Sequence, residues 1–311
     1  MLFLLAVVLP GLFWQSGPET APSLRQAGIT HILVPASQVE SWKNVSGIDA
    51  RAFDLQGAQK LPSPGVSFRM ERSSASRVPW ITSNGWHFIR RPDGRFYYDV
   101  KERDAALAAA EAFCYQADAA VQTDESGLGP LAGMLKFLGS IDSHKGQPVA
   151  DIGVIDDGSP AAGEVLNLLV RDNLLFKIVH SPTTDLKLTV ELGSKEYPIQ
   201  EEKNPVALAQ KIRANLTDDR RTLRIYGTSV VVARLTKDPG GLRLHLLNYG
   251  EARGARVGAF RVRVLGRYTK AQLHSFGSPG DQLTDYDLEP GATEFTVPEL
   301  KAYAVVDLSD K

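Results

Sequence analysis

The clearest pattern of apolar and polar positions lies between residues 149 and 179. An apolar run over residues 152–155 contains no proline and predicts a strand covered on both faces. Ser159 and Pro160 then favour a helix start, because the hydroxyl accepts from a free first-turn N–H and proline needs no N–H there. Apolar residues at helical spacing follow, and then a second apolar run. The stretch therefore predicts a strand, a helix and a parallel strand joined by a right-handed crossover.

The same alternation of short apolar runs and helical stretches extends from residue 23 to residue 222. An alanine-rich helix is expected over residues 104–116, with a strand directly after it. The turn Pro92-Asp93-Gly94, between two aromatic segments, predicts a hairpin over residues 80–98. Strands that alternate with helices indicate a mostly parallel sheet, so we expect an α/β domain with a TIM-barrel-like or related parallel-sheet fold.

The pattern changes at about residue 223. Leu242, Leu244 and Leu246 alternate with Arg243 and His245, and further short segments with the same period of two follow between turn signals. Without any long helix, this pattern is typical of two packed antiparallel sheets. Residues 223–311 are therefore predicted to form an all-β antiparallel sandwich.

The first nine residues are apolar throughout, which is typical of the central part of a signal peptide. The usual basic start is missing, since the first basic residue is Arg25. We interpret residues 1–22 as a signal-like segment and expect a secreted or periplasmic protein. A first buried strand and the clipped start of a longer chain remain alternatives. The run is too short to span a bilayer comfortably, and no other transmembrane candidate is present.

Composition narrows the range of partners. The 311-residue chain has a formal net charge of −1, so nothing indicates binding to nucleic acid. Cys114 is the only cysteine, so no internal disulfide can form. The histidines have no metal-ligand spacing, and neither a G-x-G-x-x-G sequence nor a phosphate loop is present. We therefore expect no metal and no cofactor.

Polar residues follow each candidate strand of the α/β domain, and they are Asp54, Glu71, Asp124 with Glu125, Asp156 with Asp157, and His180. If the strands are parallel neighbours, these side chains collect on one rim. Two carboxylates across such a cleft can act as acid and base, or acid and nucleophile, on a glycosidic bond. The candidate catalytic residues are Asp124, Asp156 and Asp157. The competing interpretation is that they cap helices or form turns.

Carbohydrate needs flat apolar surfaces and hydrogen-bonding groups. Trp80 and Trp86 are candidates for stacking on sugar rings, while Arg72, Asn84 and His180 are candidates for hydrogen bonds to hydroxyl groups. Packing in the core is the alternative role of both tryptophans.

Two features together resemble a known family. The segment VIDDGSP (residues 154–160), with the later LRLHLLNYG (242–250) and YAVVDL (303–308), is similar to the back half of multidomain glycoside hydrolases. The resemblance implies an α/β barrel, sometimes followed by an amidotransferase-like α/β domain, and a C-terminal β-sandwich. The Asn-Glu strand end of that family is absent, because the candidate positions read Thr123-Asp124-Glu125 and Ile155-Asp156-Asp157.

Two functional hypotheses follow. The first is an exported carbohydrate-active protein, a glycoside hydrolase that uses a pair of carboxylates. The second is a non-catalytic carbohydrate-binding or cell-envelope scaffolding protein that retains a hydrolase fold without its chemistry.

Overall fold

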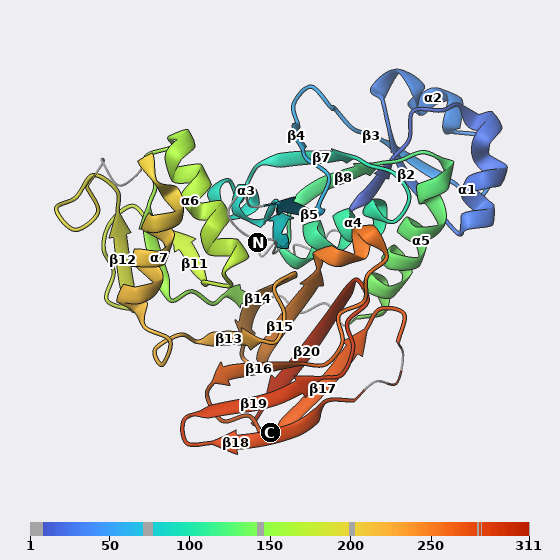
Figure 1. Cartoon of the computed structure of the whole chain (residues 1–311). Coiled ribbons are helices and arrows are strands. Elements are labelled where there is room, and N and C mark those ends of the chain that lie inside the picture. Colours follow the sequence, from blue (N-terminus) through green and yellow to red (C-terminus); the bar gives the residue numbers. More distant parts are fainter. Residues whose placement is uncertain are drawn as a thin grey trace.

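The computed structural model of the chain describes residues 9–70, 77–141, 146–198, 203–278, 280 and 282–310. It contains a large parallel sheet, a smaller parallel sheet and a pair of antiparallel sheets. Figure 1 shows the six-stranded sheet with its helices at the upper right, the three-stranded sheet with its helices at the left, and the antiparallel sheets at the bottom. The predicted fold class, an α/β domain followed by antiparallel β-sheets, is confirmed.

All pairs of neighbouring strands in the six-stranded sheet run parallel. The strands are β1 (Gly11–Phe13), β2 (His31–Val34), β3 (Asp49–Ala52), β4 (Gln59–Leu61), β7 (Arg95–Asp99) and β8 (Asp118–Gln122). Their spatial order is β3-β2-β1-β8-β7-β4, so the first strand pairs with the last. This is the ring order of a barrel opened between β3 and β4, because a doubly wound sheet would place the first strand beside the fourth.

The βαβ unit predicted over residues 149–179 is confirmed in the second parallel sheet. That sheet has the order β11-β10-β12 and consists of β10 (Ile152–Ile155), β11 (Phe176–Ile178) and β12 (Leu188–Glu191). The crossover helix is α6 (Pro160–Arg171), and α7 (Pro205–Leu216) packs beside it. Ser159 caps α6, since its hydroxyl oxygen accepts the backbone N–H of Ala162 at 3.0 Å.

The antiparallel part begins with β13 (Leu223–Tyr226) and contains two sheets. One has the order β13-β16-β19-β18, with β16 (Phe260–Leu265), β19 (Ala292–Val297) and β18 (Thr284–Glu289). The other has the order β17-β20-β15-β14-β9, with β17 (Lys270–Ser275), β20 (Tyr303–Ser309), β15 (Gly241–Asn248), β14 (Val231–Asp238) and β9 (Gln147–Pro148). The edge strand β9 thus comes from the part of the chain that precedes β10.

Helices cover the six-stranded sheet. They are α1 (Ala21–Ala27), α2 (Val39–Trp42), α4 (Asp104–Cys114) and α5 (Glu125–Ser140), with the short 3-10 helices η1 (Pro18–Thr20) and η2 (Ala36–Gln38). Every residue of α4 after Asp104 is buried. The helix contacts α5 and β8, and it also contacts β15 and the 3-10 helix η4 (Tyr249–Arg253). Its run of alanines suits this position, because small side chains allow close packing against several neighbours.

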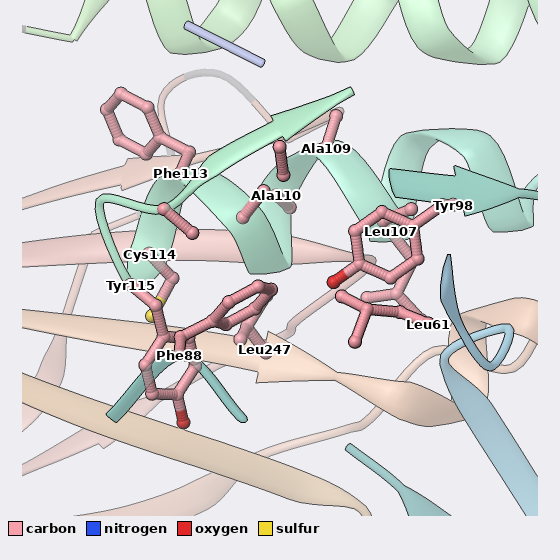
Figure 2. Packing of buried hydrophobic residues seen from close by; sticks show 14 of the residues in the cluster. Leu61, Phe88, Tyr98, Leu107, Ala109, Ala110, Phe113, Cys114, Tyr115 and Leu247 are labelled. Atoms are coloured by element: carbon pink, nitrogen blue, oxygen red, sulfur yellow. The ribbon is translucent and has the colours of Figure 1, made fainter. Parts of the chain in front are cut away.

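The sheet that contains β14 and β15 is covered on both of its faces. Val231, Ala233 and Leu235 belong to the core between the two antiparallel sheets. The alternate residue Val232 belongs to the core of the α/β part, and so does Leu247. Figure 2 shows Leu247 close to the side chains of α4. The apolar character of LRLHLLNYG follows, since this strand is buried on two sides rather than one.

The hairpin predicted over residues 80–98 is wrong. Strand β5 (Gly65–Met70) pairs antiparallel with β6 (Arg77–Thr82), and residues 85–90 then form the helix α3 (Gly85–Arg90). Gly85 and Phe88 lie on the buried side of α3, and a Cβ atom at Gly85 would lie 2.2 Å from the ring of Tyr115. The residues around Gly85 therefore form a helix that packs on Tyr115. Strand β7 does not pair with them and instead pairs with β4 and β8 in the parallel sheet.

The segment predicted to be signal-like, residues 1–22, overlaps the folded core. Residues 1–8 lie outside the described residues. Residues 11–13 form β1, which pairs with both β2 and β8, and Leu12 and Phe13 are buried. The alternative interpretation, a first buried strand, describes this later half of the segment. Within the described ranges, no helix has both the length and the apolar character needed to cross a bilayer.

Candidate ligand pocket

Asp124, a predicted catalytic residue, caps a helix. Its carboxylate accepts the backbone N–H of Ser126 at 3.1 Å and also the Ser126 hydroxyl, at the start of α5. Its carboxylate also lies at the limit of ion-pair distance from Lys101, whose Nζ is 4.0 Å from Oδ2. The hydroxyl of Ser126 is the main reason that the pKa of the Asp124 carboxyl is held below its usual value.

Asp156 and Asp157 occupy the turn between β10 and α6. The Asp156 carboxylate accepts Nε and Nη2 of Arg90 at 2.7 and 2.8 Å, and also the N–H of Gly158. Asp157 accepts the backbone N–H of Ser159 at 2.8 Å, and this bond lowers the pKa of its carboxyl. Asp156 therefore links α3 to the turn before α6, and Asp157 forms a local turn.

The structure places these carboxylates at the ends of strands in two different sheets. Asp124 follows β8 in the six-stranded sheet, whereas Asp156 and Asp157 follow β10 in the three-stranded sheet. Asp54, after β3, accepts the backbone N–H of Gln56 at 2.9 Å. Each of them thus accepts from the backbone of its own turn, in the way that helix caps and Asx turns do. Glu71 lies outside the described residues.

The predicted carbohydrate contacts lie in separate surroundings. Trp80 stacks under the guanidinium of Arg171 at 3.6 Å from the ring centre. Trp86 stacks on His87, with ring centroids 3.6 Å apart, and also packs against Gly163 of α6. Both tryptophans are partly buried beside the main core. Arg72 lies outside the described residues.

Asn84 is fully buried and contacts a carboxylate that sequence analysis did not select. Glu111 of α4 is 0% exposed, and its Oε1 accepts the Asn84 backbone N–H at 2.6 Å, the Ser83 hydroxyl at 3.1 Å and the Tyr249 hydroxyl at 2.5 Å. Its Oε2 accepts the Asn84 side-chain amide at 2.9 Å and the Tyr98 hydroxyl at 2.8 Å. Five donors from three segments converge on one carboxylate, and we call this group of residues the Glu111 cluster.

The Glu111 cluster holds the α/β part and the antiparallel part together. Tyr249 lies in η4, directly after β15, and Tyr98 lies in β7. Burial, with the Glu111 carboxylate close by, raises the pKa of both tyrosine hydroxyls well above its usual value, so both remain hydrogen-bond donors. Because the Glu111 carboxylate accepts five hydrogen bonds from protein groups, we assign this cluster a structural role.

A pocket of about 580 Å³ lies where the three parts of the molecule meet. Its walls come from α3, the end of α4, the end of α6, β11, β9 and β14, and its lining residues include Phe88, Arg90, Tyr115, Gln116, Lys177, His180 and Arg234. Phe88 and Tyr115 contact each other with ring centroids 5.7 Å apart, and Figure 2 shows them side by side at the end of α4. His180 is the one predicted binding residue that the described structure brings to this pocket.

The charged side chains that line this pocket in the described structure are all positive. Among its lining residues are Arg90, Lys177 and Arg234, and no aspartate or glutamate lines it in the described structure. Arg90 is neutralised by Asp156 and Lys177 by Asp185, whose Oδ2 lies 2.9 Å from Nζ. Arg234 has no carboxylate within ion-pair distance among the described residues, so its positive charge is left without a counter-charge.

The guanidinium of Arg234 is held in place by neutral groups. Its Nη1 donates to the backbone oxygen of Cys114 at 3.0 Å, and its Cζ lies 4.8 Å from the ring centre of Tyr115. Burial lowers the pKa of Arg234. Cys114 itself is fully buried, and burial raises the pKa of its thiol to about 12, so it packs as a small apolar residue.

Sequence reasoning missed Arg234 because the alternation in β14 marks it as an outward-facing position. In an ordinary sandwich that face meets solvent. Here the α/β part covers this face, since Val232 of the same strand is buried in the α/β core. The sequence holds one signal of this, because Val232 is an apolar residue on the same face of the strand as Arg234. Within the described ranges, no group of three or more His, Cys, Asp or Glu side chains converges as metal ligands do.

The sequence matches no protein-family model and no curated protein. The structure is similar to an α-L-fucosidase, isoenzyme 2, from Paenibacillus thiaminolyticus, with a TM-score of 0.57 and 9% sequence identity over 88% of this chain and 70% of that one. A rhamnosidase from Novosphingobium sp. PP1Y gives a TM-score of 0.43 and 11% identity over 70% of this chain and 31% of that one. At such identity a likeness shows the fold alone. The chain therefore shares its architecture with the α-L-fucosidase, in agreement with the architectural resemblance to glycoside hydrolases in its sequence.

Proposed function

We propose that this protein binds carbohydrate in the pocket between its three parts and does not hydrolyse it. The observation that carries the proposal is the pocket itself: about 580 Å³, with aromatic side chains in its walls and no carboxylate among its described lining residues. This volume lies within the range of small-molecule sites. The ligand class is taken from the likeness to the fucosidase and from the sequence resemblance to glycoside hydrolases.

Hydrolysis by a pair of carboxylates is the competing function. It requires two carboxyl groups roughly 5 to 9.5 Å apart in one cleft, each with its oxygens accessible to the substrate. The candidate carboxylates follow strands of two sheets, and each accepts hydrogen bonds from its own turn. These contacts favour binding without turnover.

Two measurements on the full-length protein test the proposal. Binding is measured on a glycan array and confirmed by calorimetry with each glycan that binds. Turnover is measured with a broad panel of chromogenic aryl glycosides. We expect saturable binding of at least one glycan and no release of the aryl group. Turnover that disappears in Asp124→Asn or Asp157→Asn would establish the hydrolase instead, because asparagine preserves the cap and removes only the acid.

The ion pair between Asp156 and Arg90 gives a prediction about the structural role of Asp156. Asp156→Asn breaks the two-point ion pair with Arg90, and we expect the free energy of unfolding to fall by about 1–3 kcal/mol. Asp157→Asn is the matched control and should cost less than about 0.5 kcal/mol, since asparagine forms the same turn. Urea denaturation measures both variants. Equal and negligible effects would mean that the Arg90–Asp156 pair contributes little to stability.

The position of β1 gives a test of the predicted export. If a leader is removed on export, we expect cleavage before Gly11, because cleavage after residue 22 would remove a strand that pairs on both sides. N-terminal sequencing of the protein recovered from the periplasm or medium locates the cut. A mature chain that begins after residue 22 and still folds would contradict this expectation.

A further inference from the structure

We propose that the pocket selects a sugar that carries a carboxylate, and that Arg234 is the residue that binds this group. The inference rests on the proposed carbohydrate-binding function and names the class of ligand. It starts from one guanidinium that lines the pocket and has no carboxylate partner in the described structure.

The hydrogen bonds of Arg234 account for only part of its donors. A guanidinium has five N–H groups in a planar fork. In the described structure one bond runs from Nη1 to the oxygen of Cys114, and Cζ lies over the ring of Tyr115 at 4.8 Å from its centre. The ring contact and the hydrogen bond both restrict the guanidinium, so a ligand carboxylate meets a partly preorganised group rather than a freely moving one.

The free-energy cost of a cation without a counter-charge also favours an anionic ligand. A charge removed from water is unfavourable unless a partner compensates it. The two other cations that line the pocket have their partners in Asp156 and Asp185. Among the described residues, Arg234 is therefore the one cation lining this pocket that lacks a counter-charge.

A single missing negative charge favours a carboxylate over a phosphate as the ligand group. A carboxylate carries one negative charge and two oxygens in a plane, which match one guanidinium fork. A phosphate monoester carries close to two negative charges near neutral pH and would need more than the single uncompensated cation of this pocket. The rings of Phe88 and Tyr115 supply apolar surface for the body of a sugar, while Gln116 and His180 supply polar groups for its hydroxyls.

The first experiment uses the unmodified full-length protein. Isothermal calorimetry compares D-glucuronate, D-galacturonate and N-acetylneuraminate with D-glucose, D-galactose and the methyl ester of each acid. We expect at least one acid to bind about tenfold more tightly than both its neutral counterpart and its methyl ester, because a charge-assisted, two-point hydrogen bond is lost in each comparison. Benzoate and inorganic phosphate complete the panel.

The second experiment uses the Arg234→Met variant, which keeps an unbranched side chain and removes the charge. We expect it to lose the tenfold preference for the acid while its circular dichroism stays unchanged. Arg224→Met is the matched control, because the Arg224 guanidinium also stacks on a tyrosine, Tyr226, with its Cζ 4.7 Å from the ring centre, but Arg224 is not among the residues that line this pocket. This control should bind as the unmodified protein does. If Arg234→Met does not fold, the methyl-ester comparison still decides the matter.

The outcomes separate the inference from the function on which it rests. Equal affinity for acids, esters and neutral sugars would overturn the inference and leave carbohydrate binding intact. Binding of benzoate or phosphate without any sugar would overturn both, and so would the absence of any sugar binding across the panel.

Discussion

Two charged groups lie between α4 and the antiparallel part of the molecule, and they are treated in opposite ways. Glu111 accepts five hydrogen bonds, two of them from tyrosines whose hydroxyl pKa is raised by burial. Arg234, beside the C-terminal end of the same helix, has one backbone oxygen and one aromatic ring. The hydrogen bonds of the Glu111 carboxylate are thus all supplied by the protein, whereas the Arg234 guanidinium lines a pocket. A buried charge alone therefore does not mark a candidate site, whereas a partly buried charge with unfilled bonding capacity beside a cavity is a candidate for one.

The largest expected effect comes from breaking the complete cluster. Glu111→Gln keeps the shape of the side chain but turns an amide donor towards groups that already donate. We expect the free energy of unfolding to fall by about 3–5 kcal/mol, as when one partner of a buried charged network is removed. Urea denaturation measures it. Glu40→Gln is the control, since Glu40 forms only an exposed ion pair with Lys43, and its loss should be below about 0.5 kcal/mol. A loss for Glu111→Gln as small as the control's would contradict the structural role of the cluster.

The next effect concerns the two tyrosines of the cluster. Tyr249→Phe removes a hydroxyl that contacts both Glu111 and Ser83, whereas Tyr98→Phe removes one that contacts Glu111 at 2.8 Å. We expect losses of about 2–3 kcal/mol for Tyr249→Phe and about 1–2 kcal/mol for Tyr98→Phe. A double-mutant cycle with Glu111→Gln should show strong coupling, because the residues share one network. Additive effects would show that the tyrosines act independently of Glu111.

A smaller effect comes from His87, which avoids a buried charge by staying neutral. Burial lowers its pKa to about 4, with Arg90 and Arg91 adding to the shift. The folded state thus disfavours the protonated ring, so the contribution to stability is full above about pH 6.5 and falls as the pH drops from 6.5 towards 4.

His87→Asn should remove this dependence. Between pH 7 and pH 4 we expect the unmodified protein to lose about 1–2 kcal/mol more than the variant, after allowing for partial exposure of the ring. Urea denaturation at the two pH values measures the difference, and His31→Asn, at an exposed position, is the control. If His87→Asn loses as much stability as the unmodified protein does, His87 is not the group that titrates.

The smallest expected effect is on the stability of the Arg234→Met variant. Removing a partly buried charge that has no counter-charge in the described structure should change the free energy of unfolding by no more than about 1 kcal/mol in either direction. The sharpest test of the contrast between Glu111 and Arg234 is to compare the loss in unfolding free energy of Arg234→Met with that of Glu111→Gln. A loss above about 3 kcal/mol would make Arg234 a structural residue like Glu111.

Most of the fold could be predicted from local patterns in the sequence. The βαβ unit around Ser159 and Pro160 depends on a cap, a first-turn proline and two apolar strands, all of which are visible within thirty residues. The antiparallel strands after residue 223 follow from a period of two. The hairpin prediction is wrong around Gly85, because the helix there depends on close packing against Tyr115, thirty residues away in the chain.

The candidate site was harder to predict, since each of its features depends on contacts between distant segments. Glu111 in an alanine-rich helix looks like an exposed acid until Tyr249 is placed beside it. Arg234 looks like a solvent-facing residue until the α/β part covers that face of β14. The aspartates that follow strands were visible in the sequence, but only the assignment of their strands to two sheets separates Asp124 from Asp156.

The edge strand β9 has a consequence for dissecting the molecule. Gln147 and Pro148 pair with Lys237 and Thr236, so a segment that precedes the βαβ unit closes one side of a sheet made much later in the chain. A fragment that starts at Leu223 would expose the backbone of β14 along this edge and would tend to self-associate. On the ribosome, residues 147–148 must wait for nearly ninety more residues to be synthesised before they find their partners, which makes their docking a late event in assembly.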